Sequence, residues 1–320
     1  MNLTLKNAKS ADEQIALLES RGLQVDHTLA KQWLANVSYY RLSGYWYPAR
    51  AFDRGAGKRL DHFDPGFTFQ NATDLYEADR KLRTLLHDGM ERVEIALRTQ
   101  VTNHLCNRHP SDPTFYLTSE VFRDKFNHLA WIHCIYGRLR RSSEHSDPVA
   151  HYKNNYSGTF PLWVAAEVMD FSDISILYTG LKHDDQLAIA ENLGFSLDKE
   201  ELSQKQLKKL PKGHPLANWI HQLTIIRNTC AHHGRLWNKS FKPVSINGLR
   251  GNGNLSVIER SQSERVFDAI AVMAHILREV SPGTSWPDKV LSLINNSFLP
   301  NPLVEPSSLG IPERWDHKTM

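Results

Sequence analysis

The 320-residue sequence contains only three cysteines, Cys106, Cys134 and Cys230, and no C-x-x-C pair. An odd number of cysteines argues against a disulfide framework, and the missing pair argues against a zinc ribbon. We therefore expect three reduced thiols, most of them buried. The zinc-protease pattern H-E-x-x-H is also absent.

Long apolar runs are missing as well, because none reaches the roughly 18 residues that a membrane-spanning helix needs. The first residues, MNLTLKNAKSADEQ, lack the apolar centre of a secretion signal. We therefore expect no membrane association and a cytoplasmic location. The sequence shows no internal repeat and no low-complexity segment.

A strong excess of one charge is absent too. The net charge of +3 is too small to indicate a nucleic-acid-binding protein, so local clusters must carry that claim. Two basic clusters exist, at Gly137–Arg141 and Lys205–His214, and a solvated helix face or loop explains either at least as well. Within the second cluster, Lys208 and Lys209 are candidate RNA contacts.

The sequence does contain hydrophobic residues at helical spacing. The clearest stretch runs from Asn71 to Leu105, where apolar residues recur for about nine turns. With few convincing strands, this pattern predicts an all-α fold. Further helices are expected within SADEQIALLESRG, DHTLAKQWLANV, TSEVFRDKFNHLAWIHCIYGRLRR, FPLWVAAEVMDFSDISILYTGL, HPLANWIHQLTIIRNTCAHH and SERVFDAIAVMAHILREV.

We divide the chain into two parts. Residues 1–70 form a small helical unit followed by the aromatic stretch SYYRLSGYWYPAR and by a Gly- and Asp-rich segment that suits an exposed loop or a hairpin. Residues 71–320 form the main helical domain and end in an extended, proline-rich strap. In the aromatic stretch we assign most rings to the core, and Tyr40 with Arg41 to RNA binding.

The stretch RNTCAHHGRLWN ends a strongly apolar helix with polar side chains: Arg227, Asn228, His232, His233 and Arg235. In a helix, Arg227 and His232 lie about 7.5 Å apart along the axis and roughly 140° apart around it, so both can reach one small target. A phosphodiester is such a target, because arginine stabilises charge on a pentacoordinate phosphate and histidine transfers protons near pH 6.5.

RNA carries its own nucleophile, the 2′-hydroxyl, so its cleavage requires no metal and no covalent enzyme intermediate. The products would end in a 2′,3′-cyclic phosphate and a 5′-hydroxyl. The competing chemistry is metal binding by His232, His233 and Cys230. Adjacent helical residues point about 100° apart and seldom ligate one ion, so we expect neither a metal nor another cofactor.

RNTCAH is similar to the R-x4-H signature of HEPN-domain ribonucleases. Over nearly the whole chain, a longer set of stretches in the same order resembles the Abi-like (AbiD/AbiF) proteins of bacterial abortive infection. These stretches are YYRLSGYWYP, DRKLRTLLHDGMERVEIALRTQV, PLWVAAEVMDFSDIS, RNTCAHHGRLWN and LGIPERW.

The resemblance implies a HEPN-like helical bundle and a homodimer in which two motifs form a composite cleft. It also implies metal-independent RNA cleavage, a toxin-like role in phage defence and restraint by a small non-coding RNA antitoxin. Carried onto this chain, Arg227 holds the scissile phosphate, His232 is the acid/base and Asn228 orients one of them. His233 fits an R-x5-H spacing and is the alternative acid/base, although we favour His232.

Several other residues are candidates for supporting roles. Arg98 and His104 also fit R-x5-H, but pairing of Arg98 with Glu94 at helical spacing is the better interpretation. Either Glu94 or Arg98 is expected to support the Arg227 helix. Glu167 lies in an apolar helix, where burial would require a partner such as a motif arginine or histidine. Arg235 either contacts RNA or locks the turn after the helix.

The first hypothesis is therefore a homodimeric endoribonuclease toxin that acts on tRNA or other single-stranded loops. The second is a non-catalytic RNA-binding module whose arginines and histidines only grip phosphates. A third, nucleotidyl or AMP transfer onto a partner, ranks last because the sequence contains no nucleotide-binding pattern.

Overall fold

The computed structural model describes residues 7–261 and 263–319. Residues 1–6, part of the start in which we expect no secretion signal, lie outside the described residues. Helices dominate, as predicted, and one antiparallel hairpin, β1 (Arg50–Asp53) with β2 (Lys58–Phe63), is the only sheet in the described ranges. The all-α prediction is confirmed, and so is a hairpin in the Gly- and Asp-rich segment.

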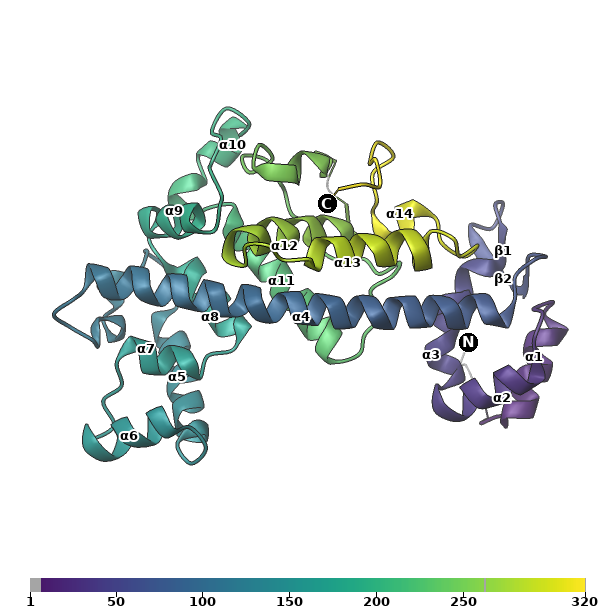
Figure 1. Cartoon of the computed structure of the whole chain (residues 1–320), viewed down its shortest axis with the longest axis horizontal. Helices are drawn as coiled ribbons and strands as arrows, with labels where there is room; N and C mark the ends of the chain where they lie inside the picture. Colours follow the sequence, from purple (N-terminus) through teal and green to yellow (C-terminus); the bar gives the residue numbers. More distant parts are fainter. Residues whose placement is uncertain (1–6, 262, 320) are drawn as a thin grey trace.

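Helix α4 (Phe69–Arg108) forms the axis of the molecule and runs along most of its length (Figure 1). Thr68 and Asn71 cap its start reciprocally, each side chain accepting the other residue's amide at 3.1 and 2.9 Å. The predicted helix from Asn71 to Leu105 is confirmed and is slightly longer than expected. Its buried stripe includes Leu75, Leu82, Leu86, Val93, Leu97 and Val101.

The other helices pack around α4. At one end of α4 lie the N-terminal helices, and α3 packs directly on it. Along its length α4 contacts α7, α8, α9, α11, α12 and α13. The bounds are α1 Ala11–Ser20, α2 His27–Asn36, α3 Tyr39–Trp46, α5 His128–Ser142, α6 Asp147–Asn155, α7 Leu162–Glu167, α8 Phe171–Gly180, α9 His183–Asn192, α10 Gln204–Leu207, α11 Leu216–Ala231, α12 Phe267–Val280, α13 Trp286–Leu293 and α14 Pro306–Leu309.

The prediction of one helix over residues 160–181 is wrong, because the segment forms two helices, α7 and α8. Asp170 and Asp173 make a reciprocal cap at the start of α8, each side chain accepting the other's amide at 3.0 Å. These bonds satisfy the first amides of α8 and fix a turn where a continuous helix would have carried on.

The helix expected from residue 118 begins later, at His128. The side chain of Asn127 accepts the amide of Ala130 at 3.2 Å and so caps α5. The preceding residues contain only a single 3-10 turn, Ser119–Val121. Helices α3, α6, α9, α10, α13 and α14 were not predicted, and α14 lies in the C-terminal segment that we expected to be extended.

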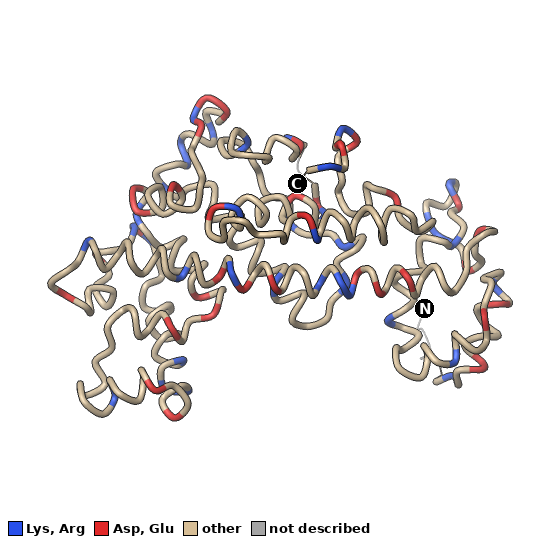
Figure 2. The backbone as a smooth tube through the Cα atoms, viewed as in Figure 1, with Lys and Arg blue, Asp and Glu red and all other residues tan. Residues whose placement is uncertain are grey.

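The charges are spread over the whole fold. Figure 2 shows Lys and Arg interspersed with Asp and Glu along the chain, as the small net charge suggests. None of the described helices combines the length and the apolar composition that a bilayer crossing requires. The division at residue 70 stays a prediction, and that residue lies in the first turn of α4.

Candidate functional site

The motif stretch begins in the last turns of α11, whose first half is anchored in the core. Trp219, Ile220, Leu223 and Ile226 are almost fully buried, and α11 packs against α4, α8 and α12. The helix ends at Ala231, and the amide of the next residue, His232, still donates to Asn228 O at 3.0 Å. A buried support therefore fixes the end of α11, where the polar side chains begin.

Arg227 is partly exposed, with 33% of its side chain accessible. Its Nε lies 3.9 Å from Oε2 of Glu94, and its Nη1 lies 3.4 Å from Oδ1 of Asn228. Glu94 pairs at 2.9 Å with Arg98, which donates to Met169 O at 2.7 Å. The structure thus brings Arg227, Asn228, Glu94 and Arg98 together.

The Glu94 carboxylate sits between two guanidinium groups. Burial raises the pKa of Glu94, while the charges of Arg98 and Arg227 act in the opposite direction. A partly buried carboxylate is stabilised by nearby cations, so the Glu94 ion pair restrains Arg227. The pair involves Nε of Arg227 at 3.9 Å. Part of the Arg227 fork remains accessible from solvent.

The turn after α11 presents both histidines to solvent. His232 and His233 are exposed, and His233 has a φ of 54°, in the left-handed region that residues with a side chain rarely adopt. The amide of Gly234 closes the turn by donating to Thr229 O at 2.8 Å. Of the two histidines, only His233 lines the neighbouring cavity.

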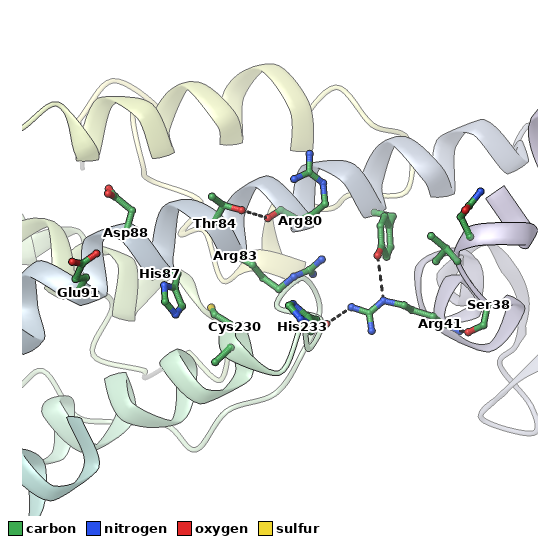
Figure 3. A pocket seen from close by; sticks show the side chains of 14 residues that line it. Ser38, Arg41, Arg80, Arg83, Thr84, His87, Asp88, Glu91, Cys230 and His233 are labelled. Carbon is green, nitrogen blue, oxygen red and sulfur yellow. Dashed lines mark hydrogen bonds between the residues drawn. The ribbon is translucent and has the colours of Figure 1, made fainter. Parts of the chain in front are cut away.

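Arg41 of α3, one of the N-terminal helices, binds this turn. Its guanidinium donates to the carbonyl of His233, its Nε lies 3.3 Å from the hydroxyl of Tyr76, and it lies over the Tyr76 ring at 5.7 Å (Figure 3). The neighbouring Tyr40 is 89% exposed, whereas Tyr45 and Trp46 are buried. Most rings of this stretch are therefore core, as expected, and Tyr40 is free to meet a ligand.

Arg235 packs into the protein. Its guanidinium donates to the carbonyl of Gly44 and lies 5.9 Å from the ring centres of both Tyr45 and Trp237. A Cβ atom at Gly44 would meet this guanidinium at 2.7 Å, so the contact depends on glycine there. Of the two roles considered for Arg235, the observed contacts serve the locking of the turn, and RNA contact stays a prediction.

A buried carboxylate that the sequence analysis missed organises the same region. Asp79 of α4 accepts the amides of Leu236 and Trp237 at 3.2 and 2.8 Å, the hydroxyl of Tyr45 at 2.7 Å, and the guanidinium of Arg83. Burial raises the pKa of Asp79, and these four donors counteract that effect. The signal was available, because Asp79 stands at helical spacing with the buried leucines of α4.

A cavity of about 840 Å³ opens beside the motif, between α3, α4 and the end of α11 (Figure 3). Its wall on α4 is basic at one end and acidic at the other. The lining residues are Asn36, Val37, Ser38, Arg41, Tyr76, Arg80, Arg83, Thr84, His87, Asp88, Glu91, Cys230, Ala231 and His233. Among the described residues, no three His, Cys, Asp or Glu side chains gather as metal ligands would.

The part of the chain that matches a known family includes this site. A family model described as Abi-like protein matches residues 32–238, which include the cavity and end with the last residue of RNTCAHHGRLWN. The chain belongs to the Abi-like family. No curated protein and no solved structure matches it.

The Abi-like match associates the chain with abortive infection, the defence of bacteria against phage. The matched residues contain every lining residue of the cavity and all of α11. They leave out α1 and everything that follows Asn238, including α12 and α13. The family relationship therefore covers the candidate site and the helices that carry it.

Other candidates lie away from the motif. Lys208 and Lys209 are exposed just before α11, whose 16 residues, about 24 Å of helix, separate them from its end. His104 pairs with Asp185 at 2.9 Å, so the Arg98 and His104 spacing reflects two separate structural pairs.

The expected burial and pairing of Glu167 is wrong. Glu167 is exposed at the last position of α7, and within residues 7–261 and 263–319 no ion pair joins it to the motif. The reason is that Glu167 lies on the solvent face of α7, one turn after the exposed Trp163. The support that we expected from Glu167 comes instead from Glu94 and Asp79.

Proposed function

We propose that this Abi-like protein is a metal-independent endoribonuclease of the HEPN type that acts as a toxin in phage defence. One observation carries the proposal: Arg227, His232 and His233 stand at the accessible end of a helix that is mostly buried. Of the three, His233 also lines the neighbouring cavity of about 840 Å³. A helix end held only for stability would have no need of this combination of groups.

The end of α11 is held on three sides. Asp79 binds the amides that follow the turn, Arg41 binds the carbonyl of His233, and Arg235 binds the carbonyl of Gly44. Catalytic groups must be held within about 0.5 Å of a productive position, and such supporting contacts provide that precision. The site is therefore organised before a substrate arrives.

The proposed reaction is the attack of a ribose 2′-oxygen on the adjacent phosphorus. A histidine, His232 in our assignment, removes the 2′-hydroxyl proton while Arg227 stabilises the added negative charge on the phosphate. The bond from phosphorus to the 5′-oxygen breaks, and that oxygen takes up a proton. The fragments then end in a 2′,3′-cyclic phosphate and a 5′-hydroxyl. Asn228, 3.4 Å from Arg227, would orient the guanidinium.

The cavity supplies a path for the strand. Arg41 and Arg80 line its basic end, and both can contact phosphates of a strand that crosses the end of α11. The exposed ring of Tyr40 stands next to Arg41 and offers a face on which an unpaired base can stack. Single-stranded loops, such as those of tRNA, are therefore the proposed substrates.

Two further parts of the proposal rest on the family relationship. We propose a homodimer in which the ends of both α11 helices face one composite cleft, and restraint of the toxin by a small non-coding RNA. A bound inhibitor RNA would use the same phosphate contacts as a substrate. Its removal would be needed before activity is measured.

A second candidate function is RNA binding without cleavage. It is favoured by one observation: in the described part of the chain, no carboxylate is hydrogen-bonded to the ring of His232 or His233. Catalytic histidines are commonly oriented by such a partner. A protein that only grips phosphates would bind RNA with strong salt dependence and leave every strand intact.

The test uses purified protein freed of bound nucleic acid, total RNA and a chelator of divalent cations. We expect the wild type to fragment the RNA, and Arg227→Ala and His232→Ala to leave it intact. His133→Ala, which changes an exposed histidine on α5, should cleave like the wild type. Intact RNA with the wild type, together with salt-dependent binding, would favour the second candidate.

A further inference from the structure

Resting on the proposed endoribonuclease function, we propose that His87 of α4 is the second proton-transfer group of the site. It would act on the same phosphodiester from the α4 wall of the cavity, which His233 lines from the end of α11. With it, α4 and the end of α11 of one chain would supply one acid and base pair, and the composite cleft of the proposed homodimer would contain two such pairs.

The reaction itself requires two proton transfers. One proton leaves the 2′-hydroxyl as its oxygen attacks phosphorus, and one proton reaches the 5′-oxygen as the bond between phosphorus and that oxygen breaks. The attacking and departing oxygens lie on opposite sides of the phosphorus in an in-line displacement. Two groups on opposite sides of the phosphate serve this geometry better than a single histidine.

The structure places an imidazole on the α4 wall of the cavity. His87 is exposed on α4 and lines the cavity together with Cys230 and His233 from the end of α11 (Figure 3). In Figure 3 the His87 ring points from α4 towards the motif, and the Cys230 side chain lies between it and the turn. The α4 and α11 walls are held in contact by their packing, so the two sets of groups face a common space.

The groups around His87 suit proton transfer. On α4, Arg83 precedes it by one turn, Asp88 adjoins it, and Glu91 follows by one turn and also lines the cavity. Glu94, about two turns further on, interacts electrostatically with His87 and with Arg227. A carboxylate at this spacing can hold an imidazole in one orientation. From the other elements, His233 follows α11 and Arg41 comes from α3. Arg41 and His87 line opposite ends of the cavity, with Arg83 and His233 between them (Figure 3).

A purely structural role does not account for His87. Its side chain is exposed, and no hydrogen bond engages its ring among the residues that the structure describes. Histidines with structural roles in this protein are bonded, as His275 is to Gly194 O at 2.9 Å and His104 is to Asp185. The ring of His87 is accessible and available to a substrate.

The experiment compares His87→Ala and His87→Gln with the wild type and with His133→Ala, the exposed α5 histidine. The substrate is a fluorescently labelled single-stranded RNA of mixed sequence, in the presence of a chelator. We expect both His87 variants to lower kcat by about 100-fold or more, the usual contribution of one proton-transfer group. KM should stay within about threefold, and the pH profile should lose one of its two limbs.

Thermal unfolding of each variant separates an effect on chemistry from an effect on folding. Replacing an exposed ring that makes no hydrogen bond among the described residues should leave Tm unchanged. The inference is overturned if His87→Ala keeps kcat within about threefold of the wild type with both pH limbs intact. If His87→Ala is active and Arg227→Ala is inactive, the proposed endoribonuclease function is retained and only the proposed role of His87 is wrong. If the wild type cleaves no RNA, both fail together.

Discussion

The carboxylate of Asp79 accepts the backbone amide of Trp237 at 2.8 Å, although 158 residues separate them in the chain. This bond joins the first third of α4 to the turn that ends the motif stretch. The same carboxylate receives Tyr45 from α3 and Arg83 from α4. One buried side chain therefore fixes the relative positions of the three elements that surround the cavity.

Replacing this carboxylate should be costly. Asp79→Asn would leave Arg83 without its counter-charge and would turn an amide donor towards backbone donors. We expect a loss of about 3 kcal/mol or more in the free energy of unfolding, measured by denaturant titration. Asp12→Asn, which breaks the exposed pair of Asp12 with Lys31, should cost at most about 1 kcal/mol. Equal effects of the two changes would contradict the structural role of Asp79.

The pairing of Glu94 with Arg227 predicts an effect on activity. Glu94→Gln keeps the shape of the side chain but removes the charge that restrains Arg227 and Arg98. We expect RNA cleavage to fall by about tenfold or more, with little change in Tm. Glu167→Gln is the matched control and should cleave at the wild-type rate. A fully active Glu94→Gln variant would show that this pair is dispensable.

Replacing either of two helical glycines, Gly89 and Gly137, by alanine should change the stability of the protein in opposite directions. A Cβ atom at Gly89 of α4 would meet Nε1 of Trp286 at 2.6 Å, in the place where that nitrogen donates to Leu85 O. Gly89→Ala should therefore destabilise the fold by about 1 to 3 kcal/mol.

At Gly137 of α5 the nearest atom to an added Cβ lies at 3.6 Å, an ordinary contact. Gly137→Ala should stabilise the protein by up to about 1 kcal/mol, because alanine favours the helix. Thermal unfolding measures both variants. Stabilisation by Gly89→Ala would show that the core around Trp286 is looser than the structure indicates.

The buried Asp268 predicts a dependence of stability on pH. Burial raises its pKa from the ordinary 3.8 to about 7, and the hydrogen bond from the Ser263 amide at 3.2 Å acts in the opposite direction. Because the pKa is higher in the folded state, its contribution to stability is complete below about pH 4 and is lost as the pH rises through 7.

Asp268→Asn removes this titration while keeping an acceptor for the amide. Relative to the wild type, the variant should therefore gain free energy of unfolding between pH 4 and pH 7, by up to about 4 kcal/mol. Denaturant titrations at a series of pH values measure the difference. A difference that does not change with pH would show that Asp268 is charged in the folded protein.

Local signals in the sequence predicted most of the fold. The capping pair of Ser10 and Glu13 marks α1, and the apolar stripe of α4 marks the longest helix. The break between α7 and α8 was missed because apolar residues continue on both sides of it. Its signal was the spacing of Asp170 and Asp173, whose mutual cap ends one helix and begins another.

The candidate site was found only in part. The polar residues at the end of α11 stand out in the sequence because an apolar run precedes them. Their support comes from residues more than 100 positions earlier, such as Asp79, Arg41 and Glu94, and helical periodicity does not reveal which helices will meet. A carboxylate on an apolar helix face indicates a buried and paired side chain. We used this rule to predict a buried Glu167, whereas it holds for Asp79.

Analysis of the RNA ends by mass spectrometry tests the central proposal most directly. Total RNA is incubated, in the presence of a chelator, with wild-type protein or with Arg227→Ala. We predict 2′,3′-cyclic phosphate and 5′-hydroxyl ends with the wild type, and no new ends with the variant. Intact RNA with the wild type, or fragments with 3′-hydroxyl and 5′-phosphate ends, would contradict the proposed reaction.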